Sequence, residues 1–286
     1  MFILMSLRTA APVLPWHRPP RNDICLIEKY YMKKTFTRIP WLGLISIMTG
    51  LLAWWLVARY SGLPRFILPA PHDVWTSFVK TLMNGTLLQH TFITLTEIVL
   101  GMLVGVCFAT VVGYMLAKSR TLEKILSPYL VASQAIPIVA IAPLLVIWLG
   151  GGILSKVLIC ALIVFFPVLV NTVVGIRAVP AALYDLMNSV RATRWQILFK
   201  LEIPASMPIL LGGLRIGVTL SVIGAIVGEL VNAKQGLGYL LQLGDFQYDT
   251  SMVYVAVFML IFLALGLYGI VAWVEGRVLI WQEKNK

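Results

Sequence analysis

The sequence predicts an all-α, polytopic membrane protein with about six transmembrane helices and a helical cytoplasmic loop. Of its 286 residues, 59% are hydrophobic and only 12% are charged, whereas charged residues make up about a quarter of a soluble domain. The mean hydropathy is +0.89. The apolar runs are continuous rather than alternating, which excludes a transmembrane β-barrel. Such runs are accommodated in lipid as helices.

Six apolar runs define the expected transmembrane helices. They cover residues 41–58, 91–117, 125–149, 157–175, 209–231 and 252–274. We therefore expect a transmembrane domain over residues 41–275, followed by a short cytoplasmic tail, 276–286.

A basic segment, residues 1–40, precedes the first run. Its first 31 residues are basic, contain several prolines and show no helical periodicity, so we expect them to be disordered. Met32 is followed by two lysines and then by the first apolar run. The sequence leaves open whether translation starts at Met1 or at Met32.

The distribution of Lys and Arg predicts the orientation. With the N-terminus inside, 18 of the 23 Lys and Arg residues fall on the side of the termini and five on the other. Since basic residues accumulate in cytoplasmic loops, both termini are expected in the cytoplasm of a bacterial cell, with the chain in the inner membrane. The same bias explains the net charge of +11 without a nucleic-acid partner.

A polar loop, residues 176–208, separates the fourth and fifth apolar runs. Pro180 suits the first turn of a helix, which predicts a helix over 181–190. Four apolar side chains fall at helical spacing on one face of it, and such a face can dock into a groove on a partner. They are Leu183, Leu186, Met187 and Val190.

A second short helix is expected after a turn in the same loop. Thr193 and Gln196 have the spacing of a capping box, which predicts a helix over 194–202 that ends before Pro204. A solvated or membrane-surface amphipathic helix is the alternative to docking for this helix pair.

Five residues in or beside the apolar runs are candidates for a solute pathway or gate: Glu97, Pro137, Pro143, Trp148 and Glu229. Acids within a membrane often face a pathway, although Glu229 could equally cap a re-entrant loop. Helices that prolines kink or break often line transport routes. Ladders of small residues at every fourth position, such as Gly101 and Gly105, indicate close helix packing, whether static or moving.

No catalytic, cofactor-binding or metal-binding residues are expected. The chain contains no Gly-Lys dipeptide, which excludes a phosphate-binding loop of the GxxxxGK[ST] type. The three cysteines lack metal-ligand spacing, and His17, His72 and His90 lie outside the expected spans.

The loop resembles the cytoplasmic signature of permease subunits of bacterial ATP-binding-cassette (ABC) importers, Glu-Ala-Ala, three residues, Gly, nine residues, Ile, one residue, Leu-Pro. Here Asp185-Leu186-Met187, Arg191, Leu201 and Ile203-Pro204 stand at these positions. Arg191 replaces the usual Gly, which puts the local turn geometry and the fit to a particular ATPase in doubt.

Other stretches are similar to the nitrate, taurine and sulfonate group, which includes importers of thiamine-precursor pyrimidines and riboflavin. They are Leu68-Pro69-Ala70-Pro71, Ile136-Pro137, Ala142-Pro143-Leu144, Trp148, Gly150, Gly213-Leu214-Arg215, Glu229 and Gly236-Leu237-Gly238-Tyr239. Arg191 and the Thr96-Glu97 pair make the chain more similar to the vitamin and precursor members.

The resemblance implies a transport subunit that is not itself an enzyme. It implies a second permease copy or paralogue, a cytoplasmic ATPase dimer that binds ATP, and an extracytoplasmic solute-binding protein. The expected ATPase-coupling residues are Leu183, Asp185, Leu186, Met187, Val190, Arg191, Thr193, Trp195 and Gln196. The sequence identifies neither the solute nor whether the pore is a homodimer or a heterodimer.

Three other classes compete with this interpretation. An ion-gradient-driven transporter would need buried acids or an internal repeat, and the sequence offers only Glu97 and Glu229. An intramembrane enzyme would need a nucleophile and base or a metal cluster. A purely structural subunit would not explain the organised loop at 176–208.

Overall fold

The computed structural model describes residues 40–279, and every regular element among them is a helix. The chain divides into two units, residues 1–61 and 62–286. The described part of the first unit is helix α2 (Pro40–Tyr60). Residues 1–31, which were predicted to be disordered, lie outside the described residues. Most of the predicted tail, residues 276–286, also lies outside them.

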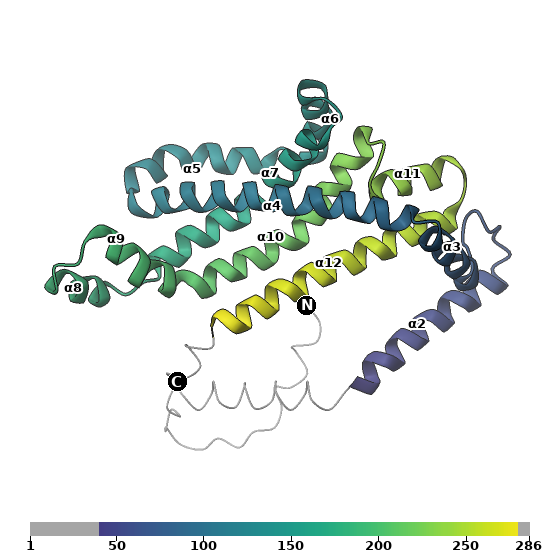
Figure 1. Cartoon of the computed structure of the whole chain (residues 1–286), viewed down its shortest axis with the longest axis horizontal. Helices are drawn as coiled ribbons and strands as arrows, with labels where there is room; N and C mark the ends of the chain where they lie inside the picture. The colour runs from purple at the N-terminus through teal and green to yellow at the C-terminus, as the bar shows by residue number, and fades with distance from the viewer. Residues whose placement is uncertain (1–39, 280–286) are drawn as a thin grey trace, which may run out of the picture. The chain divides into compact units, whose positions relative to one another are not determined.

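The second unit contains the remaining helices (Figure 1). In chain order they are α3 (Pro71–Met83), α4 (Thr86–Lys118), α5 (Arg120–Ala135), α6 (Ile138–Leu149), α7 (Ile153–Arg177), α8 (Ala181–Ser189), α9 (Arg194–Ile197), a π-helical turn (Leu198–Glu202), α10 (Ile203–Asn232), α11 (Leu237–Phe246) and α12 (Thr250–Val278). Within residues 40–279, five helices are long and apolar enough to cross a membrane, or six if the bent pair α5–α6 counts as one span. This confirms the predicted all-α, polytopic fold.

Helix α7 lies between α4 and α10, and small residues allow the three backbones to approach closely (Figure 1). A Cβ atom added at Gly105 of α4 would lie 2.8 Å from the carbonyl oxygen of Ala161 in α7. One added at Gly213 of α10 would lie 2.6 Å from Cβ of Asn171. The predicted small-residue ladders therefore form the two faces that pack on α7.

The third predicted span is broken. Residues 125–149 were expected as one span with a kink or a break at its prolines, and its two halves, α5 and α6, meet at 94°. The break lies at Ile136, whose φ of −85° and ψ of 118° are extended. The ring of Pro137 disfavours helical geometry in the residue before it and supplies no N–H group, so a full break replaces a kink.

The prediction that the second loop helix ends before Pro204 is wrong. Helix α9 runs through the π-helical turn directly into α10, and Pro204 lies in the first turn of α10. A proline at this position lacks only an N–H that the start of a helix leaves free, and the wider π turn changes the hydrogen-bond register before it. The polar loop is therefore rigidly continuous with the fifth span.

Helices α8 and α9 lie at one end of the α4–α7–α10–α12 bundle, and α6 and α11 lie at the other (Figure 1). At the α8–α9 end, Arg215 of α10 forms an ion pair with Glu275 of α12 at 2.6 Å between Nε and Oε2. The two ends carry the two groups of candidate functional residues.

Candidate coupling surface and solute pocket

Helix α8 exposes the apolar face predicted from the sequence. None of its residues is buried, and Leu183, Leu186 and Val190 are 38%, 59% and 68% exposed. Met187 is half-buried. Asp185 is also exposed, but two positions of helix place it about 200° away from Leu183. The exposed strip is therefore apolar, with the carboxylate on another side of the helix.

The turn after α8 is a Schellman motif with Arg191 in the left-handed position. The φ of Arg191 is +53°, and the N–H groups of Arg191 and Ala192 donate to the carbonyls of Asn188 and Met187 at 2.9 and 3.0 Å. Glycine is the residue that adopts this backbone without strain. The geometry explains why the family signature has Gly here, and the arginine keeps the same turn.

The predicted capping box at α9 is present. The backbone N–H of Thr193 donates to Oε1 of Gln196 at 2.8 Å, and the N–H of Gln196 donates to the Thr193 hydroxyl at 3.4 Å. One turn on, the rings of Trp195 and Phe199 stack with centroids 5.9 Å apart. Both side chains are exposed, so the α9 segment presents an apolar surface as well.

A buried carboxylate connects this surface to the bundle. Glu202 is 1% exposed, forms an ion pair with Lys118 at the end of α4, and accepts hydrogen bonds from Tyr114 at 3.0 Å and from Tyr184 of α8 at 3.1 Å. Burial, followed by the neighbouring Glu202 carboxylate, raises the pKa of the Tyr184 hydroxyl to about 12. The sequence analysis did not predict this cluster, because its partners come from three separate segments.

At the opposite end, side chains hold the first turn of α11. The N–H groups of Gly236 and Leu237 donate to Nδ1 of His90 and to the hydroxyl of Thr94, each at 2.8 Å. The N–H of Gly238 donates to Oε2 of Glu229 at 2.5 Å. Of the two roles considered for Glu229, its contacts are those of a cap.

The same network fixes the position of the turn between α10 and α11. The Thr94 hydroxyl also donates to Oε1 of Glu229 at 2.6 Å. Gly236 has a φ of +114°, and a Cβ there would collide with the Glu229 carboxylate. Only glycine fits this position, both for its backbone angle and for its space.

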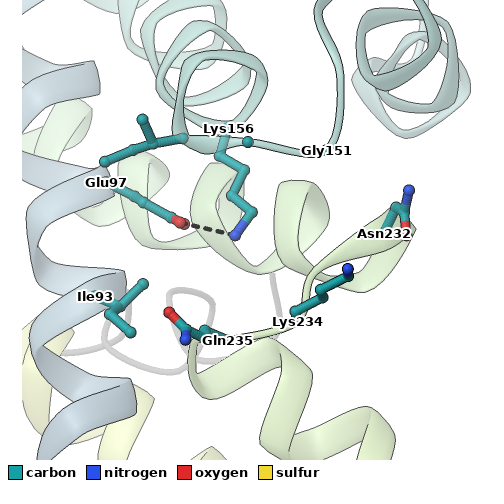
Figure 2. Close-up of a pocket in the computed structure, with 9 residues that line it drawn as sticks. Ile93, Glu97, Gly151, Lys156, Asn232, Lys234 and Gln235 are labelled. Atoms are coloured by element: carbon teal, nitrogen blue, oxygen red, sulfur yellow. Dashed lines mark hydrogen bonds and ion pairs between the residues drawn. The ribbon is translucent and has the colours of Figure 1, made fainter.

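Glu97 forms a second buried contact beside this network. Its Oε1 accepts a hydrogen bond from Nζ of Lys156 in the first turn of α7 at 2.9 Å, with side-chain exposures of 1% and 7%. Figure 2 shows the two side chains pointing toward each other across the gap between α4 and α7. The ammonium of Lys156 satisfies one of the two carboxylate oxygens, and Oε2 of Glu97 is buried without a hydrogen-bond partner among the described residues.

A pocket of about 690 Å³ opens beside the Glu97–Lys156 pair. It lies where α4, the α6–α7 link and the α10–α11 link meet (Figure 2). The residues that line it are Ile93, Glu97, Gly151, Gly152, Ile153, Lys156, Asn232, Lys234 and Gln235.

The five predicted pathway residues separate into two groups. Glu97 and Glu229 meet at the network between α4, α7, α10 and α11. Pro137, Pro143 and Trp148 are exposed along α6 and do not line the pocket. Their role in a pathway stays a prediction.

Three residues of this end were missed by the sequence analysis. They are His90, Thr94 and Lys156. The second span was expected to begin at 91, but α4 begins at Thr86 and His90 is buried within it. His90, Thr94 and Glu97 follow one another at helical spacing, and a search for polar stripes within the apolar run could have found them.

The relation to known proteins follows from comparison of the whole chain. The family described as "Binding-protein-dependent transport system inner membrane component" matches residues 97–280. The chain belongs to this family. It is a permease subunit of an ABC importer, a multi-pass membrane protein and not an enzyme, and the ATPase activity resides in a separate subunit. Membership of this family excludes the ion-gradient-driven transporter considered from the sequence.

Similar proteins have several different solutes in their names. The chain is 41% identical over 252 residues to the riboflavin transport system permease protein RibX of Chloroflexus aurantiacus, covering 87% of this chain and 94% of that protein. It is 32% identical to the formylaminopyrimidine transport permease protein ThiX of Halalkalibacterium halodurans, covering 89% and 100%. It is 31% identical to the taurine transport system permease protein TauC of Escherichia coli, covering 77% and 84%.

A solved structure supports the fold. A chain of the MetNI methionine ABC transporter in inward-facing conformations superposes with a TM-score of 0.56, covering 68% of this chain and 97% of that one. The sequence identity is 18%, so the similarity concerns the fold alone.

Proposed function

We propose that this permease imports a vitamin or vitamin precursor, riboflavin or a thiamine-type pyrimidine. The supporting observation is the 41% identity to the riboflavin permease over 87% of the chain, together with 32% identity to the formylaminopyrimidine permease over 89% of the chain. Similarity to the taurine permease is 31% over 77%. The alternative is the same machinery with a sulfonate, taurine or nitrate-type anion as its solute.

The proposed orientation places α8 and α9 in the cytoplasm together with both termini. It is supported by the bias of 18 of 23 Lys and Arg residues toward that side. Helices α7 and α10 each cross the membrane once, and α8 and α9 connect their cytoplasmic ends. The pocket and α11 lie at the other ends of α7 and α10, and therefore toward the extracytoplasmic side.

The proposed contact with the ATPase dimer is the exposed apolar surface of α8 and α9. Leu183 and Leu186 on α8, Val190 at its C-cap and the stacked pair Trp195 and Phe199 are all exposed. Exposed apolar strips of this kind insert into grooves on a partner. ATP bound by that partner would supply the energy. A solute-binding protein on the other side and a second permease copy or paralogue complete the proposed assembly.

The substrate is tested by uptake. The permease is co-expressed with the ATPase and binding protein encoded beside it and reconstituted into proteoliposomes containing ATP or its non-hydrolysable analogue. Labelled riboflavin, a formylaminopyrimidine and taurine are then supplied with the binding protein. We expect ATP-dependent uptake of riboflavin or the pyrimidine that excess taurine does not inhibit. If taurine alone is imported, the vitamin assignment is wrong and the solute is of the anion type.

A further inference from the structure

The pocket beside Glu97 and Lys156 has the size and construction of a small-molecule site. Its volume of about 690 Å³ falls within the usual range for such sites, about 300–1,000 Å³. Three chain segments form it. Directly after Lys234 and Gln235, the backbone N–H groups of residues 236–238 donate hydrogen bonds to the side chains of His90, Thr94 and Glu229 and fix this segment. Its walls are therefore preorganised.

The floor of the pocket presents an ammonium group with unused donors. The side chain of Lys156 is 7% exposed, and among the residues that the structure describes its hydrogen bonds go to Glu97 alone. An ammonium carries three N–H donors. Two of them remain for a molecule in the pocket. Oε1 of Glu97 is used by Lys156, while the buried Oε2 has no hydrogen-bond partner among the described residues and can accept from a donor on the same molecule.

The rim adds more donors and another positive charge. Lys234, Asn232 and Gln235 are exposed there, and Lys234 forms no ion pair within residues 40–279. The side chain of Gln235 points into the space between Ile93 and Lys156 (Figure 2). Counting ionised side chains, the lining holds two lysines and one glutamate, a net charge of +1.

The remaining lining is apolar or small. Ile93 and Ile153 supply apolar surface, and Gly151 and Gly152 leave backbone surface without side chains. A flat apolar body can lie against such walls, while its acceptors face Lys156, Lys234 and Gln235. Cationic solutes are disfavoured because both lysines repel them.

We propose that this pocket is a solute site of the permease itself, for a small molecule with an apolar body and hydrogen-bond acceptors or one negative charge. In the proposed orientation it receives the solute on the extracytoplasmic side. The inference deepens the proposed function and rests on it, since riboflavin and the formylaminopyrimidine are acceptor-bearing heterocycles. Taurine shares the acceptors through its sulfonate but lacks the apolar body.

Direct binding tests the pocket without the binding protein. The full-length permease with its ATPase is placed in nanodiscs and titrated with riboflavin, whose fluorescence reports binding, and with labelled taurine. Gly152→Phe adds a bulky ring to the pocket lining at a position where a Cβ meets nothing within 4 Å. Lys234→Gln removes the rim charge. The matched controls are Gly266→Phe, where a Cβ also meets nothing within 4 Å, and Lys80→Gln on the exposed face of α3.

The expected result is saturable binding that Gly152→Phe abolishes and Lys234→Gln weakens by about tenfold, with both controls within about twofold of the wild type. Saturable binding that is equal in all variants would overturn the inference. The inference would also be overturned if neither riboflavin nor taurine bound.

The uptake assay separates this failure from failure of the proposed function. If proteoliposomes import riboflavin and the pocket variants import it normally, the function stands and the pocket is wrong. If only taurine is imported and Gly152→Phe blocks it, the pocket stands and the vitamin assignment is wrong.

Discussion

The hydroxyl of Tyr184 on α8 donates a hydrogen bond to Oε1 of Glu202, 3.1 Å away, at the junction with α10. Glu202 also pairs with Lys118 of α4. A helix that otherwise buries none of its residues is thereby tied to two spans of the bundle. We therefore expect a displacement of α8 by a partner to reach α4 and α10 through this one buried carboxylate.

The first prediction concerns this connection. Tyr184→Phe removes one hydrogen bond, about 1 kcal/mol, and leaves the ring in place. We expect solute-stimulated ATPase activity of the reconstituted importer to fall several-fold, with normal assembly of the ATPase on the permease. Tyr129→Phe removes an exposed hydroxyl from α5 and should change nothing. Equal activities for the two variants would show that the hydrogen bond transmits no movement.

The pH dependence of the same contact follows from the raised pKa of Tyr184. Because that pKa is about 12 in the folded chain and ordinarily 10.0, the contribution of the hydroxyl to stability is complete below about pH 10 and is lost as the pH rises through 12. The stability difference between the wild type and Tyr184→Phe should therefore be constant from pH 7 to 10, measured by thermal unfolding in detergent. A difference that shrinks within that range would contradict the assignment of Tyr184 as the donor.

The third prediction tests the apolar face of α8. Met187→Glu places a charge between Leu183 and Val190, and burying it in a partner's groove would cost several kcal/mol. We expect at least a tenfold loss of ATPase binding or stimulation, measured by pull-down and by activity, with unchanged membrane insertion. Asn188→Glu adds the same charge to another side of α8 and is the control. Loss of coupling in both variants would point to net charge rather than to this face.

The fourth prediction concerns the left-handed turn at Arg191. With φ at +53°, glycine is favoured over any L side chain, so Arg191→Gly should be more stable than Arg191→Ala by about 1 kcal/mol. Hydrogen–deuterium exchange of the Ala192 amide, which donates across the turn, measures the difference. Both variants lack the guanidinium group of Arg191. If both lose ATPase stimulation equally, the guanidinium contacts the ATPase.

Local patterns in the sequence predicted the loop well. The capping box at Thr193 and Gln196 and the helix after Pro180 depend on residues within one turn of each other, and both are present. The sequence left a kink or a break open for the span that contains Pro137, and the structure has a break there. The helix end expected before Pro204 is absent. A proline's effect depends on whether neighbouring backbone can satisfy the groups that it frees, and this is a tertiary property.

Long-range partners could not be predicted in the same way. Lys156 looked like an outer-loop cation, and its pairing with Glu97 joins residues 59 positions apart in the chain. Glu202 likewise finds partners at Lys118 and Tyr184, which no local periodicity connects to it. The sequence marked the acids as unusual in an apolar chain, but only the packing of α4 and α10 on α7 identifies their partners.

The last prediction concerns the buried pair of Glu97 and Lys156. Lys156→Met leaves the Glu97 carboxylate, 1% exposed, without its cation, and breaking such a pair costs about 3–5 kcal/mol. Because a matched apolar pair can replace a buried ion pair at little cost, Lys156→Met combined with Glu97→Leu should recover most of this loss. Thermal unfolding of the two variants in detergent measures the recovery. A double variant as unstable as the single one would show that Glu97 contributes mainly through its neighbour Glu229 rather than through Lys156.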